Sequence, residues 1–215
     1  MEQAGRADGP SPCLPVAGVP EGVREAVVVA APLGAAVAGF GGCMAMLAAS
    51  GVRLRVVVPG AWPAPHAAPP REVLAFLGAP QAELECLEGT RCDEAVRHLS
   101  FLVKGADLCA APWCGDRGTA AGAARWAALL ACSLRLRPPL VEYWVPGHCA
   151  APQGCGEPWQ RAARVPLPPG AERRKRRALC AGRAADPGAA EPAAGCTDGA
   201  PAGGARLGAR EILFL

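Results

Sequence analysis

The chain has 215 residues, 51% of them hydrophobic, and a formal net charge of +3. This length suits one α/β domain with a sizeable buried core, and so small a net charge does not indicate nucleic acid or an anionic membrane as a partner. The 11 cysteines are odd in number and form no Cys-x-x-Cys pair, which argues against a secreted disulfide framework. The amino-terminal residues lack the apolar region of a signal peptide. We therefore expect a reduced, cytoplasmic protein.

Strand-like and helix-like segments alternate along the chain. Continuous runs of Val, Leu and Ala are typical of strands buried on both faces of a parallel sheet, and apolar residues spaced by three or four predict helices. Strands are predicted at residues 25–31, 52–60, 82–89, 106–112 and 139–145. Helices are predicted at residues 41–51, 70–78, 90–105 and 119–136, the third with Thr90 as its N-cap.

The last third of the sequence follows this pattern more loosely. Residues 161–170 indicate an edge strand, 171–183 a helix, and the closing run 210–215 a final strand that returns to the sheet. The succession of βα units predicts a single Rossmann-like α/β domain with a mostly parallel sheet flanked by helices. The domain is expected at 21–215, after a disordered segment at 1–20 and with a low-complexity loop at 182–209.

One stretch, from Ala26 to Val52, holds no charged residue and no histidine. Its length would suit a membrane span, but its proline and glycines would interrupt such a helix, so we expect no membrane segment. Its Gly-Phe-Gly-Gly run indicates a nucleotide-binding Rossmann domain as one alternative. That alternative is weak, because the spacing is not Gly-x-Gly-x-x-Gly and no acidic residue follows the second strand to bind a ribose.

Several segments occur in the order and spacing of a known protein family. They are EAVVVAAPLGAAVAGFGGCMAMLAASGVRLRVVV (25–58), ADLCAAPWCGD (106–116), PLVEYWVPGH (139–148), LPPGAERRKRRAL (167–179) and REILFL (210–215). On these segments the chain resembles the PIG-L (LmbE-like) zinc-dependent N-deacetylases of N-acetylglucosaminyl substrates. The resemblance implies their α/β fold and an active site in the loops that follow the first strand and a later one.

The reactive groups that this resemblance implies are missing. The family's His-Pro-Asp-Asp-Glu motif supplies a zinc-binding His, a general-base Asp and a zinc-binding Asp, and the matching positions are Pro32, Gly34 and Ala35. Its later His-Pro-Asp-His motif supplies an oxyanion-stabilising His and a third zinc ligand, and these match Gly118 and Ala121. Pro, Gly and Ala can neither coordinate zinc nor accept a proton. We therefore expect five degenerate pocket positions, no catalytic residue, no metal site and no cofactor.

Four further residues are candidates for the wall of the former pocket, namely Arg71, Trp113, Asp116 and His148. Each has a plainer interpretation: an exposed arginine, a core tryptophan, a turn or cap aspartate, and a histidine in a surface loop. The histidine lies near Cys149 and Cys155, but no second ligand pair accompanies them, so a zinc site is not predicted there. The basic run 173–177 is interpreted as a solvated helix face.

The sequence thus predicts a deacetylase-fold protein that is catalytically inactive, with a sugar-binding or an accessory role. Its expected ligand is a small amino sugar or glycoside, with no nucleic acid or membrane partner, and no protein partner is specified. One alternative is an active N-acetylglucosaminyl-type deacetylase or amidase that uses relocated residues such as Asp116, His148 and a cysteine. The second alternative is the nucleotide-binding Rossmann domain.

Overall fold

The computed structural model describes residues 14–18, 20–59, 69–87, 92–114, 119–133, 138–145, 158–184 and 210–215. Within these ranges the chain forms one seven-stranded sheet with the strand order β3-β2-β1-β4-β5-β7-β6. The strands are β1 (Glu25–Val29), β2 (Arg53–Pro59), β3 (Glu83–Leu87), β4 (Leu108–Pro112), β5 (Leu140–Tyr143), β6 (Ala162–Pro166) and β7 (Arg210–Phe214). The first five strands pair in parallel, while β7 pairs antiparallel with both β5 and β6. The predicted fold class, a mostly parallel α/β sheet, is confirmed.

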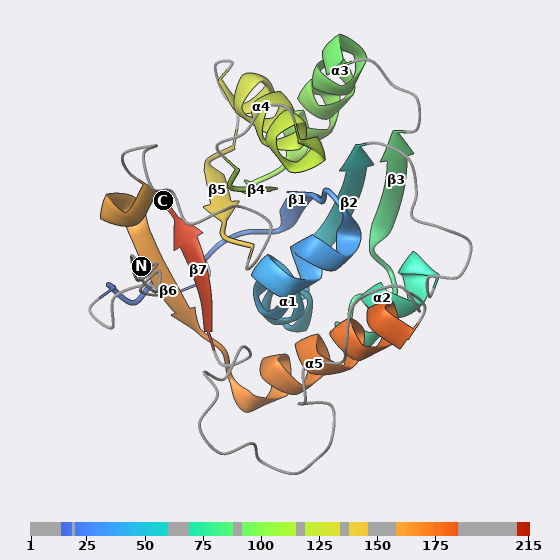
Figure 1. Ribbon diagram of the computed structural model, residues 1–215, viewed down its shortest axis with the longest axis vertical. Helices are drawn as coiled ribbons and strands as arrows, with labels where there is room; N and C mark the ends of the chain where they lie inside the picture. Colours follow the sequence, from blue (N-terminus) through green and yellow to red (C-terminus); the bar gives the residue numbers. More distant parts are fainter. Residues whose placement is uncertain are drawn as a thin grey trace, which may run out of the picture.

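Helices cover both faces of this sheet (Figure 1). The helices are α1 (Leu33–Ala49), α2 (Pro70–Phe76), α3 (Cys92–Leu102), α4 (Ala120–Cys132) and α5 (Pro169–Ala184). On one face α5 packs along both α1 and α2, and on the other α3 packs along α4. This three-layer arrangement is the one that right-handed βα crossovers produce.

Strand β1 is apolar at every position after Glu25, and the two layers of helices explain why. Ala26 and Val28 pack into the core beneath α1, whereas Val27 and Val29 pack into the core beneath α3 and α4. Because successive side chains of a strand point to opposite faces, a strand covered on both sides must be apolar at every position. All five residues of β1 are buried.

The chain's last strand completes the sheet in the manner predicted. Strand β7 lies between β5 and β6, with Glu142 opposite Phe214 and Ala163 opposite Leu213. Strand β6 forms the far edge of the sheet, as expected for the segment 161–170. The division of the chain at 1–20 and 182–209 stays a prediction, and most of those residues lie outside the described ranges.

The predicted start of the first helix at residue 41 is wrong, since α1 begins at Leu33 and runs for 17 residues. The glycines of the Gly-Phe-Gly-Gly run therefore lie within the helix and do not form the turn that a dinucleotide fingerprint requires. Their role is close packing. A Cβ on Gly39 would stand 2.5 Å from the Trp144 carbonyl oxygen, and a Cβ on Gly42 would overlap the Leu167 side chain.

None of the helices in the described ranges combines the length and the apolar character needed to cross a membrane. Cys43 and Cys109 are free thiols buried in the core, where they pack as small hydrophobic residues.

Candidate functional site

The order of the strands locates the place where a ligand site is expected. From β1 the chain adds β2 and then β3 on one side, and afterwards returns to add β4 and β5 on the other side of β1. The carboxyl ends of β1 and β4 thus flank a topological switch point, which is where open α/β sheets bind their ligands. The two loops that the sequence resemblance singled out leave the sheet at these two strand ends.

The first of these loops is very short and leads straight into α1. Pro32 is the residue before the helix, with φ −79° and ψ −180°, and its side chain makes no capping hydrogen bond. The N–H groups of Ala35 and Ala36 donate to the Pro32 carbonyl oxygen at 3.1 and 3.2 Å. Gly34 is exposed, and a Cβ added there would have no neighbour within 4 Å. The helix therefore opens with free space at Gly34 and with no acidic residue in its first turn.

The second loop leads into α4, and its helix start is capped by its own sequence. Thr119 takes an extended conformation, and its Oγ1 accepts a hydrogen bond from the Gly122 N–H at 3.0 Å. The Cys114 thiol lies 3.3 Å from the same oxygen. Ala121, one of the degenerate positions, is buried in the first turn. Gly118 and Asp116 lie outside the described residues.

The donor set at these strand ends does not fit a catalytic zinc ion. Such an ion needs three nitrogen, oxygen or sulfur ligands at about 2.0–2.3 Å, whereas Pro32, Gly34, Ala35 and Ala121 offer none. In the part of the chain that the structure describes, no three His, Cys, Asp or Glu side chains gather to hold a metal. Among the described residues, the site presents the backbone at the start of α1, small side chains, the Cys114–Thr119 pair at the start of α4 and open space at Gly34.

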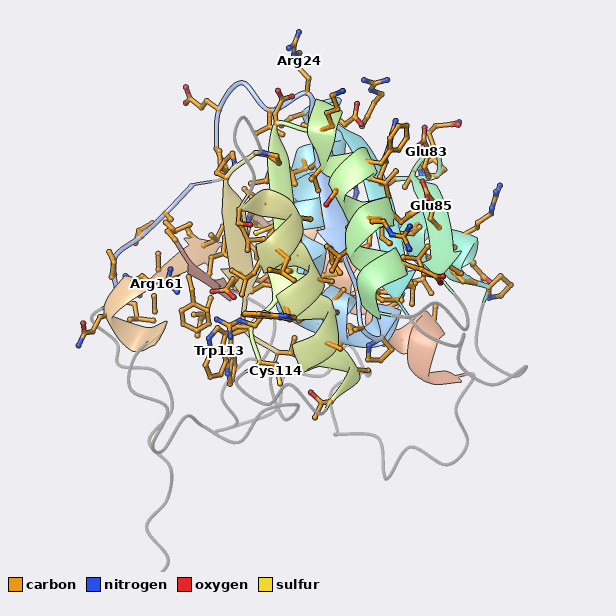
Figure 2. The ribbon with its side chains drawn as sticks, turned by 90° about the horizontal axis from the view of Figure 1, so that it is seen from above. Arg24, Glu83, Glu85, Trp113, Cys114 and Arg161 are labelled. Carbon is orange, nitrogen blue, oxygen red and sulfur yellow. The ribbon has the colours of Figure 1, made fainter. Side chains whose placement is uncertain are left out.

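Trp113 lies directly after β4 and is part of a side cluster next to the switch point. Its ring is 5% exposed, packs against Phe214 with centroids 5.6 Å apart, and carries the Arg125 guanidinium 5.9 Å from its centroid. Arg125 pairs with the buried Glu142 carboxylate, which Arg161 also approaches at 3.3 Å. Figure 2 shows Trp113 and Cys114 together at one end of the sheet, with Arg24 at the opposite end. The indole is thus held by β7 and α4.

Tyr143 fixes the end of β1 from within the core. Its hydroxyl donates to the Val29 carbonyl oxygen at 2.7 Å, and its ring stacks on Phe40 with centroids 5.4 Å apart. Burial raises the pKa of this phenol well above its usual value, so the hydroxyl stays protonated as a donor. The residue therefore positions the strand end and takes no part in acid–base chemistry.

The remaining candidate residues do not join these groups in the described structure. Arg71 is exposed in the first turn of α2. His148, together with Cys149 and Cys155, lies outside the described residues. The structure therefore brings together the starts of α1 and α4, with Trp113 and Cys114 beside the second of them.

A buried ionic junction, which the sequence analysis missed, joins α1, β7 and α5. The Glu211 carboxylate accepts hydrogen bonds from the N–H groups of Gly42 and Cys43 at 2.6 and 2.8 Å, and from Lys175 Nζ at 2.7 Å. The Lys175 and Glu211 side chains are 3% and 0% exposed. The interpretation of 173–177 as a wholly solvated run is thus wrong at Lys175. A signal existed, because Lys175 shares a helical face with the apolar Ala171 and Ala178.

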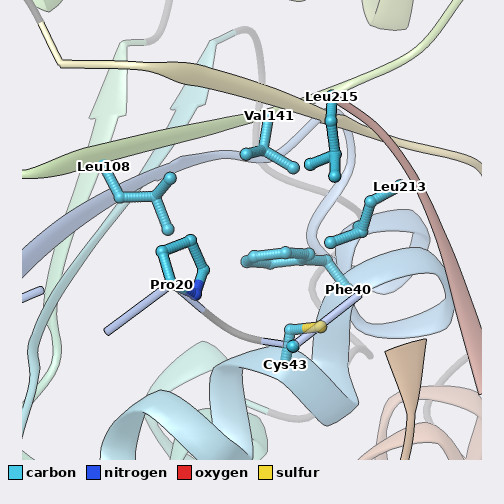
Figure 3. A pocket seen from close by; sticks show the side chains of 8 residues that line it. Pro20, Phe40, Cys43, Leu108, Val141, Leu213 and Leu215 are labelled. Carbon is cyan, nitrogen blue, oxygen red and sulfur yellow. The ribbon is translucent and has the colours of Figure 1, made fainter. Parts of the chain in front are cut away.

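An apolar pocket (Figure 3) shares Cys43 with this junction. Its lining residues are Gly18, Pro20, Phe40, Cys43, Leu108, Val141, Leu213 and Leu215. Burial raises the pKa of the Cys43 thiol well above its usual value, and the neighbouring Glu211 carboxylate raises it further. Because a protonated, buried thiol is a poor nucleophile, the pocket offers apolar contact and no reactive group among these residues.

The fold is a Rossmann-like α/β sheet, and comparisons with solved structures find a similar fold in several deacetylases. The N,N'-diacetylchitobiose deacetylase of Pyrococcus horikoshii superposes with a TM-score of 0.55 at 12% identity, covering 78% of this chain and 73% of that one. A conserved protein of Thermus thermophilus gives 0.54 at 19% identity, covering 75% and 80%. A pseudoaglycone deacetylase for an antimicrobial reagent gives 0.52 at 18% identity, covering 75% and 81%.

No protein-family model and no curated protein matches the sequence. The similarity to solved deacetylase structures confirms the resemblance to the PIG-L (LmbE-like) deacetylases at the level of the fold.

Proposed function

We propose that this chain is a non-catalytic protein with the deacetylase fold, which binds a small amino sugar or glycoside at the carboxyl ends of β1 and β4 without a zinc ion. The observation that carries the proposal is the start of α1, where Pro32, Gly34 and Ala35 offer no metal ligand and no base. Amide hydrolysis by this fold's chemistry needs a metal-bound water and a carboxylate to deprotonate it.

The choice of ligand class rests on the neighbours and on the free space. One neighbour acts on diacetylchitobiose, which makes a saccharide the first ligand to test. At the site, Gly34 is exposed and leaves room that a side chain would fill. At the start of α1 the N–H groups of Leu33 and Gly34 have no acceptor among the described residues, so they supply donors to a hydroxyl or acetamide oxygen.

A binding experiment with a blocking variant tests the ligand. Titration calorimetry with glucosamine, N-acetylglucosamine and diacetylchitobiose is expected to give binding that Gly34→Trp weakens at least about tenfold, because the indole would fill the open space. Gly105→Trp is the matched control: Gly105 is also exposed with nothing within 4 Å of an added Cβ, but it lies near the start of β4. Equal binding by both variants would contradict a sugar site at the start of α1, and no binding by the wild type would contradict the sugar ligand.

A second experiment tests whether the protein lacks deacetylase activity. The protein, incubated with diacetylchitobiose in the presence of zinc, is expected to release no acetate above the background of a heat-denatured sample. Turnover that a chelator abolishes would overturn the proposal in favour of relocated catalytic residues.

A further inference from the structure

Positive charge in this protein is concentrated on one helix. Residues 169–184, which form α5, contain six basic residues and one acidic residue and so carry a formal charge of +5. The whole chain carries +3, so the rest of the sequence stands at −2, which is three minus five. The small net charge is therefore the sum of a strongly basic helix and a slightly acidic remainder of the chain.

The helical period decides which of these charges faces solvent. Lys175 is buried and is directed toward Glu211, so it marks the inner side of α5. Residues two positions away on a helix are turned by about 200°, which places Arg173 and Arg177 on the outer side, and both are exposed. Arg174 is also exposed, and its guanidinium lies against Gly78 at the end of α2, where a Cβ would stand 2.7 Å from Nη1.

These three residues, Arg173, Arg174 and Arg177, form what we call the arginine face of α5. Among the described residues, no carboxylate forms an ion pair with any of them, whereas Arg176 pairs with Glu172 at 3.1 Å and Lys175 pairs with Glu211. Arg173 and Arg177 are four residues apart, and like charges at this spacing repel each other along a helix. An anionic partner bound at this face would relieve that repulsion.

The composition of the face distinguishes between kinds of anionic partner. A helix that docks on a membrane presents large apolar side chains beside its basic ones, and the exposed large hydrophobic residues of the described chain all lie outside α5. Single-stranded nucleic acid requires aromatic side chains on which bases stack, and α5 contains none. Double-stranded nucleic acid is typically bound through about 6–10 phosphate contacts, which three arginines do not supply.

We infer that the arginine face of α5 docks an acidic segment of a partner protein. Guanidinium groups form paired hydrogen bonds with carboxylates. Side chains four residues apart on a helix are about 5–6 Å apart at Cβ, and alternate residues of an extended chain are about 6.6–6.8 Å apart. A partner segment with Asp or Glu at every second position therefore matches the spacing of Arg173 and Arg177. This surface lies on the opposite side of α5 from the junction with β7 and is independent of the proposed sugar site.

The experiment uses a labelled peptide of ten residues that alternates Glu and Ser, titrated against the full chain at 150 mM salt. Each exposed ion pair changes a binding constant by about 1.4- to 5-fold, so Arg173→Gln/Arg177→Gln is expected to weaken binding roughly tenfold. The control Arg24→Gln/Lys104→Gln removes two exposed positive charges elsewhere and is expected to change binding less than twofold. Because all four side chains are exposed, both variants should keep the wild-type thermal transition.

Two further probes test the alternative partners. A 20-base-pair DNA duplex represents nucleic acid, and vesicles with 30% phosphatidylserine represent a membrane. The inference is overturned if the peptide does not bind, if the control weakens its binding as much as the arginine variant does, or if the duplex or the vesicles bind more tightly than the peptide. It is supported by preferential, arginine-dependent binding of the peptide. None of these outcomes depends on whether a sugar binds at the strand ends.

Discussion

Two regions along helix α1, its start and its middle, differ sharply in their chemistry. At the start of α1, next to the carboxyl ends of β1 and β4, the described side chains are small and uncharged. In the middle of α1, a buried Glu211 holds two backbone N–H groups and Lys175 at 2.6 to 2.8 Å. The charges that join α1, β7 and α5 are present, whereas the described residues at the strand ends offer no set of zinc ligands.

The residues that hold this fold together are therefore separate from the positions at which the fold could carry catalytic chemistry. A buried carboxylate that satisfies backbone donors and a lysine cannot be removed alone without leaving buried groups unpaired. Reactive carboxylates clustered in a pocket repel one another when no metal is present, so their loss can be neutral or stabilising.

The largest effect is expected at the junction. Glu211→Ala leaves Lys175 buried without its partner and should cost about 3–5 kcal/mol of unfolding free energy, measured by urea denaturation. Glu83→Ala is the control, since Glu83 pairs with Arg55 at 2.9 Å but is 58% exposed, and it should cost less than about 1 kcal/mol. Adding Lys175→Met to Glu211→Ala should recover part of the loss. Equal costs for the two single variants would contradict the structural role of the junction.

A smaller effect with opposite signs is expected at two glycines of α1. Gly39→Ala should destabilise by about 1–3 kcal/mol, because the new Cβ would stand 2.5 Å from the Trp144 carbonyl oxygen and 2.8 Å from the Tyr143 ring. Gly34→Ala meets nothing within 4 Å and should be neutral or stabilise by up to about 1 kcal/mol, as alanine favours a helix. Thermal denaturation of both variants measures the difference, and a destabilised Gly34→Ala would show that the start of α1 is packed more tightly than described.

The smallest effect concerns acid stability at the other end of the sheet. The N–H groups of Arg24 and Glu25 donate to Asp107 Oδ2 at 2.8 and 3.0 Å, and these hydrogen bonds lower the pKa of Asp107 below its usual value of 3.8. A lowered folded-state pKa contributes stability that is present above the unfolded-state pKa and is lost as the pH falls through the folded-state value.

Wild type should therefore be slightly more stable than Asp107→Asn at pH 7, and the gap should narrow at pH 3. Urea denaturation at the two pH values measures it. A gap that widens on acidification would show that the carboxylate does not hold the start of β1.

Much of the fold could be predicted from the sequence, because strands buried on both faces need continuous apolar runs. Strands β1 and β4, which are buried at every residue, carry that pattern, whereas the edge strand β3 alternates charged residues with leucine and cysteine. The start of α1 could not be predicted, because Pro32 and the alanines that follow supply no side-chain cap to mark it. Gly41 and Gly42 predict a helix start, whereas the structure places them within α1. Gly39 contacts Tyr143 of β5 and Gly42 contacts Leu167, and such tertiary contacts leave no local signal in the sequence.

The site was predictable in part. The sequence resemblance pointed to the ends of β1 and β4, and the strand order places a switch point there. The side-chain partners of Trp113 come from α4 and β7, which are distant in sequence, so its packing could not be inferred from the residues around it. The burial of Lys175 was difficult to predict because it lies within a run of arginines. The one local signal is that Lys175 shares a helical face with the buried Ala171 and Ala178.

The zinc content of the untagged protein tests the central claim most directly. The protein is purified with zinc present, dialysed, and measured for metal per chain. We predict no zinc above the level of the dialysis buffer, because the described residues at the ends of β1 and β4 offer no ligand set. One tightly held zinc ion per chain would contradict the proposal, and substitution of His148, Cys149 and Cys155 would then show whether those residues bind it.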